Sequence, residues 1–161
     1  MCEINYRCIG VVHSPFTDPK GTPIQPTGAK DVEGTVEVFP DYARGLKDLE
    51  GFSHIMLLYH LHLAKEVSLE VKPFMDDRLR GVFATRAPAR PNPIGLSVVR
   101  LVRVEGNSLH IRDLDIVDGT PLLDIKPYVP KFDIREVTRI GWLEDNVRKL
   151  PKARDDGRFV V

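Results

Sequence analysis

The chain has 161 residues, of which 42% are hydrophobic, a size and composition that suit a single domain with a sizeable core. The 23 basic and 23 acidic residues balance, so net charge gives no argument for a polyanionic partner. Two cysteines, Cys2 and Cys8, are too few for a disulfide framework or a zinc site. The longest apolar stretch, residues 55–63, contains two histidines and is too short to span a bilayer. We therefore expect a soluble cytoplasmic protein without a signal sequence.

Short β-rich runs and apolar residues at every second position predict strands in chain order. The runs cover residues 6–12, 34–39, 54–61, 81–85, 96–104, 108–116 and 122–125. Weaker helical patterns cover residues 42–49 and 140–150. No βαβ alternation appears, which disfavours a doubly wound nucleotide-binding fold. The sequence therefore predicts a mainly β protein with a small closed or nearly closed antiparallel barrel and a short helix in residues 1–135. Residues 136–161 are expected to form a helical, charged extension packed on or near the barrel.

Two segments lack a regular pattern. Residues 15–28 contain four prolines and two glycines, which predicts an ordered or lid-like loop. Residues 151–158 are charged and are expected to be loose, with residues 159–161 packing back on the domain.

Charge is unevenly distributed along the chain. Residues 78–112 hold seven arginines and one acidic residue, Glu105, whereas residues 113–130 hold four aspartates against Lys126 alone. A neutral protein can thus present a basic face beside an acidic pocket, which suits an anionic polymer docking next to a cationic cofactor.

The segment Arg86–Gly95 is stiff because three prolines in six positions fix their own backbone and extend the residues before them. Two arginines and Asn92 on so rigid a loop would be ready to bind an anion or a base edge. A plain proline-rich connection with solvated arginines is the alternative. Gly95, which allows close backbone approach, favours a ligand site.

Aspartates gather just after this segment. Asp113 and Asp115 are expected to share one face of a strand, as are Asp124 and Lys126. Asp118 is explained by a turn, but strands are depleted in aspartate and a buried carboxylate needs a partner. These carboxylates are therefore candidate functional groups.

Histidines allow a different class of function. His60 and His62 would share a strand face, and carboxylates are available, so a metal-dependent hydrolase is an alternative. The pair lacks a third ligand at a characteristic spacing, and no metal is predicted. Covalent catalysis is disfavoured because no G-x-S-x-G motif occurs.

Four motifs in order resemble one family: residues 9–15 (IGVVHSP), 49–54 (LEGFSH), 81–97 (GVFATRAPARPNPIGLS) and 114–130 (LDIVDGTPLLDIKPYVP). The chain is similar over residues 6–133 to the TsaA-like, or TrmO, methyltransferases. The resemblance implies a β-barrel, usually a homodimer, that binds S-adenosylmethionine. It also implies methylation of N6 of a hypermodified adenosine (t6A) beside the tRNA anticodon, so that the tRNA anticodon loop is the expected partner.

The resemblance also implies positions for the cofactor contacts. They fall on Pro23, Ile24, Gln25, His62, Leu63, Arg86, Leu96, Asp113, Leu114, Asp115 and Ile116. Ile24 and Leu63 replace the arginine and glutamine that many relatives carry, so contacts at these two positions are expected to be missing or made by the backbone. Many bacterial relatives carry a further C-terminal domain, so tRNA binding is expected to be local or to involve a second subunit or another protein.

Methyl transfer from a sulfonium to an amine mainly requires alignment and exclusion of water. The methylated nitrogen must then lose a proton, which Asp124 could accept with Lys126 and Tyr128 positioning the carboxylate or the base. Arg78, Arg80, Arg90 and Asn92, with Arg100 and Arg103, are candidate RNA contacts. The alternatives are a cofactor-binding or RNA-binding barrel without turnover, or methylation of another acceptor.

Overall fold

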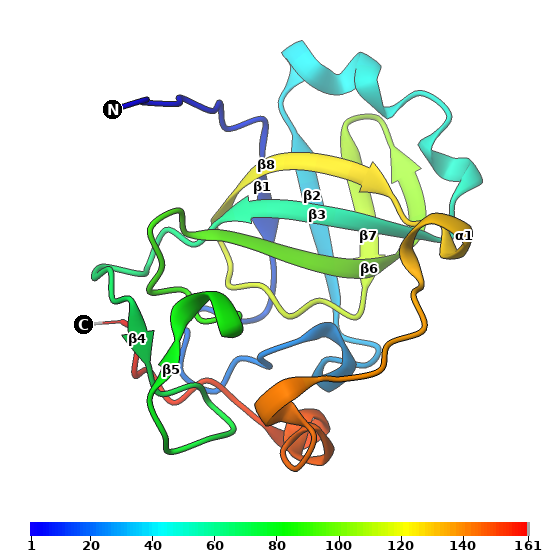
Figure 1. Ribbon diagram of the computed structural model, residues 1–161. Helices are drawn as coiled ribbons and strands as arrows, with labels where there is room; N and C mark the ends of the chain where they lie inside the picture. The colour runs from blue at the N-terminus through cyan, green and yellow to red at the C-terminus, as the bar shows by residue number, and fades with distance from the viewer. Residues whose placement is uncertain (161) are drawn as a thin grey trace.

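The computed structural model describes residues 1–160. Six antiparallel strands close into a barrel in the order β1-β2-β7-β6-β3-β8, with β8 pairing back to β1 (Figure 1). The strands are β1 (Gly10–His13), β2 (Glu33–Val38), β3 (His54–His60), β6 (Ile94–Glu105), β7 (Ser108–Arg112) and β8 (Thr120–Pro127). The predicted fold class is confirmed.

The barrel forms because apolar residues alternate along its strands. On β3, Ile55, Leu57 and Tyr59 are buried, while the residues between them face outward. Equivalent positions on the other strands fill the barrel interior with branched aliphatic side chains. The hairpin between β6 and β7 turns at Gly106, which has a positive φ of 60°.

Smaller elements surround the barrel. A two-stranded sheet joins β4 (Glu70–Val71) to β5 (Arg80–Gly81), and α1 (Pro130–Asp133) is a single helical turn. The 3-10 helices are η1 (Pro26–Gly28), η2 (Pro40–Leu46), η3 (Leu49–Gly51), η4 (Val82–Ala84), η5 (Gly141–Leu143) and η6 (Val147–Lys152).

Several predicted boundaries were wrong for local reasons. The strand predicted over residues 81–85 is mostly η4, closed by the Thr85 hydroxyl, which donates to the Val82 carbonyl. The first strand starts only at Gly10. The helix predicted over residues 42–49 is interrupted at Asp48, where φ is 68°. The one over residues 140–150 consists of two 3-10 turns, and Gly141 has φ of 60°.

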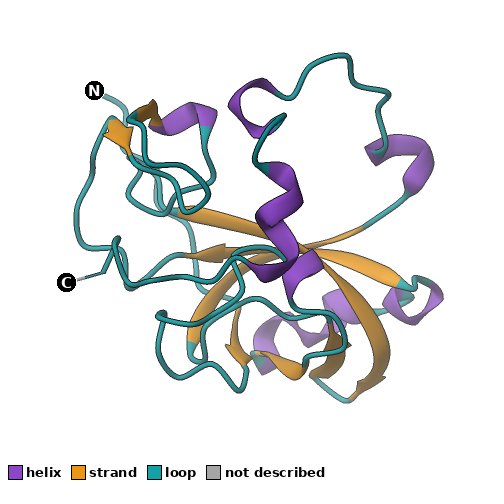
Figure 2. Cartoon of the chain, turned by 90° about the horizontal axis from the view of Figure 1, so that it is seen from below, coloured by secondary structure: helices purple, strands orange, loops and turns teal. Residues whose placement is uncertain are grey.

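The C-terminal segment, residues 141–160, packs across one end of the barrel beside the loop of residues 19–25 (Figures 1 and 2). Trp142 Nε1 donates to the Ala84 carbonyl (2.8 Å), and Arg158 Nη1 donates to the Pro73 carbonyl (3.0 Å). Phe159 packs edge-on against Phe74, as expected for a tail that folds back, although Val161 lies outside the described residues. No helix in residues 1–160 is long and apolar enough to cross a membrane.

Candidate functional site

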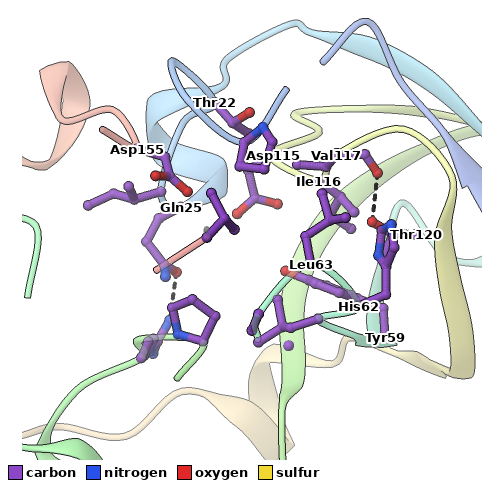
Figure 3. A pocket seen from close by; sticks show the side chains of 18 of the residues that line it. Thr22, Gln25, Tyr59, His62, Leu63, Asp115, Ile116, Val117, Thr120 and Asp155 are labelled. Atoms are coloured by element: carbon purple, nitrogen blue, oxygen red, sulfur yellow. Dashed lines mark hydrogen bonds between the residues drawn. The ribbon is translucent and has the colours of Figure 1, made fainter. Parts of the chain in front are cut away.

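A cavity of about 370 Å³ opens at the barrel end that the C-terminal segment covers (Figure 3). Three parts of the molecule surround it: the loop at residues 19–25, the ends of β3, β6 and β8 with the segments that adjoin them, and the tail. The predicted site residues among those that line it are Pro23, Ile24, Gln25, His62, Leu63, Arg86, Arg90, Leu96, Asp115 and Ile116. A volume in this range suits a small organic ligand.

Asp115 is a half-buried acidic residue of this cavity. Its Oδ1 accepts a hydrogen bond from the Ser97 hydroxyl (2.7 Å), and Ser97 Oγ lies 2.9 Å from the Tyr59 hydroxyl. Burial raises the pKa of Asp115 to about 7, against the lowering effects of the Ser97 hydrogen bond and of the Arg86 charge. Burial also raises the pKa of Tyr59, so its hydroxyl keeps its proton. A cationic ligand would compensate the charge that Asp115 carries when ionised.

Gly95 lines the cavity, and the close approach expected there is made by a side chain of the protein. A Cβ built on Gly95 would lie 2.2 Å from Cε2 of Tyr59, which pairs with Gly95 across β3 and β6. Gly95 therefore makes room for the aromatic ring that carries the hydrogen bond to Ser97.

The two arginines of the stiff loop have different partners. Arg86 is exposed, and its Nη1 donates to Gln25 Oε1 (2.7 Å), which links two predicted cofactor-binding loops. Arg90 turns back on its own loop and donates from Nη1 to the carbonyls of Thr85 (3.0 Å) and Ala87 (3.2 Å). Arg90 thus stabilises the loop, and a second role in RNA binding stays a prediction.

Asp113 and Asp115 do not share a strand face, which corrects the expectation from the sequence. Strand β7 ends at Arg112, and Asp113 has a φ of 67°, so the chain leaves the sheet there. Asp113 Oδ1 accepts from Arg100 Nη2 (3.1 Å), outside the cavity that Asp115 lines. Leu114 is fully buried in the barrel core and does not line the cavity.

The three residues predicted to be catalytic, Asp124, Lys126 and Tyr128, lie outside this cavity. Asp124 pairs across the sheet with Leu58, on the outer face of the barrel, and forms an ion pair with Lys126 (2.9 Å). Tyr128 follows β8 and lies edge-on to His54, with ring centroids 6.5 Å apart. These three side chains do not line the cavity, because Asp124 and Lys126 lie on the outward side of β8 and Tyr128 lies beyond its end.

Most of the basic run is neutralised by ion pairs. Arg80 pairs with Asp76 (2.7 Å), Arg100 with Asp31 and Asp113, Arg103 with Glu105, and Arg112 with Glu33. Arg80 also lies over the ring of Trp142. Within residues 1–160, Arg78, Arg86 and Arg90 form no ion pair. Arg78 and Asn92 are exposed, so of the predicted RNA contacts these two are unobstructed.

A second, larger cavity of about 1010 Å³ adjoins the first and shares Ile24, Gln25, Phe74, Thr85, Arg86 and Leu96 with it. Its remaining wall is largely aromatic and aliphatic, with Phe83, Trp142 and Leu143, and includes the cation Lys30. Asp113 lines this second cavity, so the two aspartates face adjoining spaces.

The structure adds three cavity residues that the sequence analysis missed, Thr22, Tyr59 and Asp155, and it adds Ser97, which binds Asp115 without lining the cavity. In the sequence, Tyr59 and Ser97 look like ordinary strand residues. A tyrosine in an apolar run is nevertheless a signal, because its buried hydroxyl needs a hydrogen-bond partner. Asp155 lies in a tail that was expected to be loose, and only the fold brings it to the cavity.

The histidines do not support a metal site. Strand β3 ends at His60, and His62 lies in the following turn, where its amide donates to the His60 carbonyl (2.8 Å). Burial lowers the pKa of His62, so its ring is neutral at neutral pH. Within residues 1–160, no group of three or more His, Cys, Asp or Glu side chains is arranged to hold a metal ion.

The fold and the cavity define a β-barrel domain with a cavity at one end, in which the half-buried carboxylate of Asp115 suits a cationic ligand. Residues 11–134 match the sequence profile of the tRNA-methyltransferase O N-terminal domain. The chain belongs to the TrmO family of tRNA methyltransferases.

Individual proteins and a solved structure that resemble this chain support the family assignment. A probable S-adenosyl-L-methionine-binding protein of Pyrococcus abyssi is 69% identical over 97% of this chain and 85% of its own length. The tRNA (adenine(37)-N6)-methyltransferase of Homo sapiens is 36% identical over 78% of this chain and 30% of its own. The crystal structure of TrmO from Pseudomonas aeruginosa superposes with a TM-score of 0.73 at 39% identity, over 88% of this chain and 63% of that one. The chain thus spans less than two thirds of the solved and human relatives.

Proposed function

We propose that the protein is a cytoplasmic S-adenosylmethionine-dependent methyltransferase that methylates N6 of the hypermodified adenosine t6A next to the tRNA anticodon. The observation that carries this proposal is the cavity at the barrel end of a TrmO-family domain, with the half-buried carboxylate of Asp115 in its wall. Cofactor-binding relatives and a tRNA-methylating relative support the two halves of the proposal.

The cavity residues fit the cofactor by their chemistry. S-adenosylmethionine carries a sulfonium and an ammonium, and the cavity offers the carboxylate of Asp115. The carboxylate and the ribose hydroxyls of S-adenosylmethionine need polar partners, which Arg86 and Gln25 provide. Ile116, Leu96 and Leu63 supply an apolar surface for the adenine. Pro23, Ile24 and His62 would complete the contacts, whereas Asp113 and Leu114 would act on the cofactor only through their neighbours.

The bound cofactor supplies an electrophilic methyl group. The residues of the chain then have to hold the reactants in line and keep water out. The hydrogen-bonded series Tyr59, Ser97 and Asp115 fixes the Asp115 carboxylate at one place in the cavity, so no reorganisation is needed when the ligand binds.

The second cavity provides a place for the acceptor adenosine. Recognition of bases in RNA loops commonly uses an aromatic side chain against which an unstacked base lies. Phe83 lines this cavity and is 75% exposed, so its ring is available for such stacking. Arg78 and Asn92, which are exposed, are proposed to contact the anticodon loop together with Lys30 of the second cavity.

A role for Asp124, Lys126 and Tyr128 in proton removal requires a second copy of the chain. General-base catalysis needs hydrogen-bond reach, and these side chains do not line the cavity of their own copy. We therefore propose a homodimer in which the outer face of β3 and β8 is brought toward the partner's cavity. Asp124→Asn should then leave S-adenosylmethionine affinity unchanged and slow methyl transfer, as measured in a single turnover.

The test of the function is transfer of labelled methyl groups from S-adenosylmethionine to tRNA. We expect the product to be methylated t6A, identified by mass spectrometry of tRNA nucleosides, and no transfer to tRNA that carries unmodified adenosine at that position. Cofactor binding without transfer to either tRNA would favour the binding module. Transfer only to unmodified tRNA would favour another acceptor.

Phe83→Ala is expected to raise the KM for tRNA roughly 5- to 100-fold, the range that corresponds to loss of one base-stacking contact. Affinity for S-adenosylmethionine should change less than about twofold, because Phe83 does not line the first cavity. Phe132→Ala is the matched control, since Phe132 is 70% exposed on α1 and lines neither cavity. Equal KM values for the two variants would argue against the acceptor site.

A further inference from the structure

The C-terminal segment contributes a carboxylate to the first cavity from outside the family domain. The family profile ends at residue 134, yet Asp155 lines the cavity together with the barrel residues (Figure 3). Its position in the sequence gave no reason to expect this, because it belongs to a charged run with Asp156 and Arg158.

The backbone of Asp155 is hydrogen-bonded to the loop of residues 19–25, which also lines the cavity. Gly21 N donates to the Asp155 carbonyl (2.6 Å), and Asp155 N donates to the Thr22 carbonyl (2.8 Å). Pro23 and Arg154 form a β-bridge beside these bonds. The bonds hold residue 155 in register with residues 21–23, so its side chain has a defined place at the cavity.

Arg158 fastens the same segment on its other side. It donates to the carbonyls of Lys72 (3.2 Å) and Pro73 (3.0 Å), and its guanidinium lies over the Phe74 ring. Its charge is paired with Asp156, whose Oδ1 accepts from Arg158 Nε (2.9 Å). The neighbouring cation is therefore committed to Asp156, and Asp155 is left without a salt-bridge partner among residues 1–160.

Only one oxygen of Asp155 has a hydrogen bond in the described part of the chain. Oδ1 accepts from the Gly157 amide (2.7 Å), and no group in residues 1–160 donates a hydrogen bond to Oδ2. The carboxylate is half-buried, and this burial raises the pKa of Asp155, against the lowering effects of the Gly157 hydrogen bond and of the Arg158 charge, while Asp156 and Asp18 add like charge. A structural role in the turn explains the hydrogen bond to Oδ1. It does not explain why Oδ2, which has no hydrogen-bond donor, belongs to a partly desolvated carboxylate at a ligand cavity.

We propose that Asp155 binds a cationic group of S-adenosylmethionine, so that the C-terminal segment completes the cofactor site of the barrel. This inference rests on the proposed function. The ligand group is either the sulfonium or the α-ammonium, both of which a carboxylate binds by charge.

Asp155→Asn tests the inference because asparagine keeps an oxygen for the Gly157 amide and loses only the charge. Calorimetric titration should show that the variant binds S-adenosylmethionine roughly 10- to 100-fold more weakly, the size of a lost charged contact. Methylthioadenosine, which lacks both cationic groups, should bind the variant and the wild type equally. Asp145→Asn is the matched control, since Asp145 is exposed on the same segment and lines neither cavity.

S-adenosylhomocysteine, which keeps the ammonium and lacks the sulfonium, identifies the group. A loss equal to that for S-adenosylmethionine assigns Asp155 to the ammonium, and no loss assigns it to the sulfonium. Unchanged binding of S-adenosylmethionine by Asp155→Asn would overturn the inference, as would an equal loss for methylthioadenosine, which indicates a structural effect. If the wild type itself binds no S-adenosylmethionine, the proposed function fails instead.

Discussion

Asp115→Asn is expected to make the protein more stable and its cofactor binding weaker at the same time. The Asp115 side chain is half-buried, and desolvation raises the pKa of its carboxyl from 3.8 to about 7. Above the raised pKa, the folded protein therefore carries a charge that burial penalises. Asparagine keeps the hydrogen bond from Ser97 and removes the charge. We expect a gain on the order of 1 to 4 kcal/mol in the free energy of unfolding at neutral to alkaline pH, since one pKa unit corresponds to about 1.4 kcal/mol.

The sign of the pH dependence follows from proton binding. Between the usual carboxyl pKa and about 7, the folded state holds a proton on Asp115 that the unfolded state has lost. The contribution of Asp115 to stability therefore falls as pH rises through this window and is constant above and below it. Urea unfolding across the window should show this decline in the wild type and a reduced decline in Asp115→Asn.

Cofactor affinity should respond in the opposite direction. A cationic ligand prefers the ionised carboxylate, so wild-type affinity for S-adenosylmethionine should rise with pH toward and beyond 7. Asp115→Asn should lower the affinity roughly 10- to 100-fold at alkaline pH and remove most of this dependence. A variant that is no more stable than the wild type at alkaline pH would show that the charge is not penalised. Unchanged affinity would remove Asp115 from the cation site.

The barrel could be predicted from the sequence because alternation of apolar residues is a local property that each strand carries in itself. The outcome at residues 108–116 shows the limit. A β-rich run predicts one strand there, but Asp113 takes a left-handed backbone and ends the ladder. That conformation is stabilised by distant partners, since Asp113 accepts hydrogen bonds from the Asp31 amide and from Arg100. Such contacts are invisible in a local pattern.

The site was predictable to the extent that it follows the family motifs. Arg86 and Gln25 come together across 61 positions of the sequence, as the resemblance implied for two loops of one site. The basic run of residues 78–112 does not form a continuous positive surface, because Arg100 and Arg112 are paired with carboxylates from other segments. Asp155 shows the converse, since a residue with no motif reaches the cavity through backbone pairing with residues 21–23.

Gly95→Ala is expected to be among the most damaging small substitutions in the barrel. The added methyl group would lie 2.2 Å from Cε2 and 2.5 Å from Cζ of Tyr59. The ring cannot swing away freely, because Tyr59 is buried and its hydroxyl is hydrogen-bonded to Ser97. Overpacking of this kind costs about 1 to 3 kcal/mol. Displacement of Tyr59 would also disturb Ser97 and Asp115, so affinity for S-adenosylmethionine should fall together with stability.

A double-mutant cycle separates this clash from a general intolerance of change at position 95. Tyr59→Leu removes the ring and leaves a void, so it destabilises the protein by itself, but Gly95→Ala should then cost little in its presence. The expected coupling is at least about 1 kcal/mol in urea unfolding. Gly45→Ala is the matched control, since no atom lies within 4 Å of a Cβ built there, and it should be nearly neutral. Additive effects of Gly95→Ala and Tyr59→Leu would mean that the glycine is required for another reason than room for the tyrosine ring.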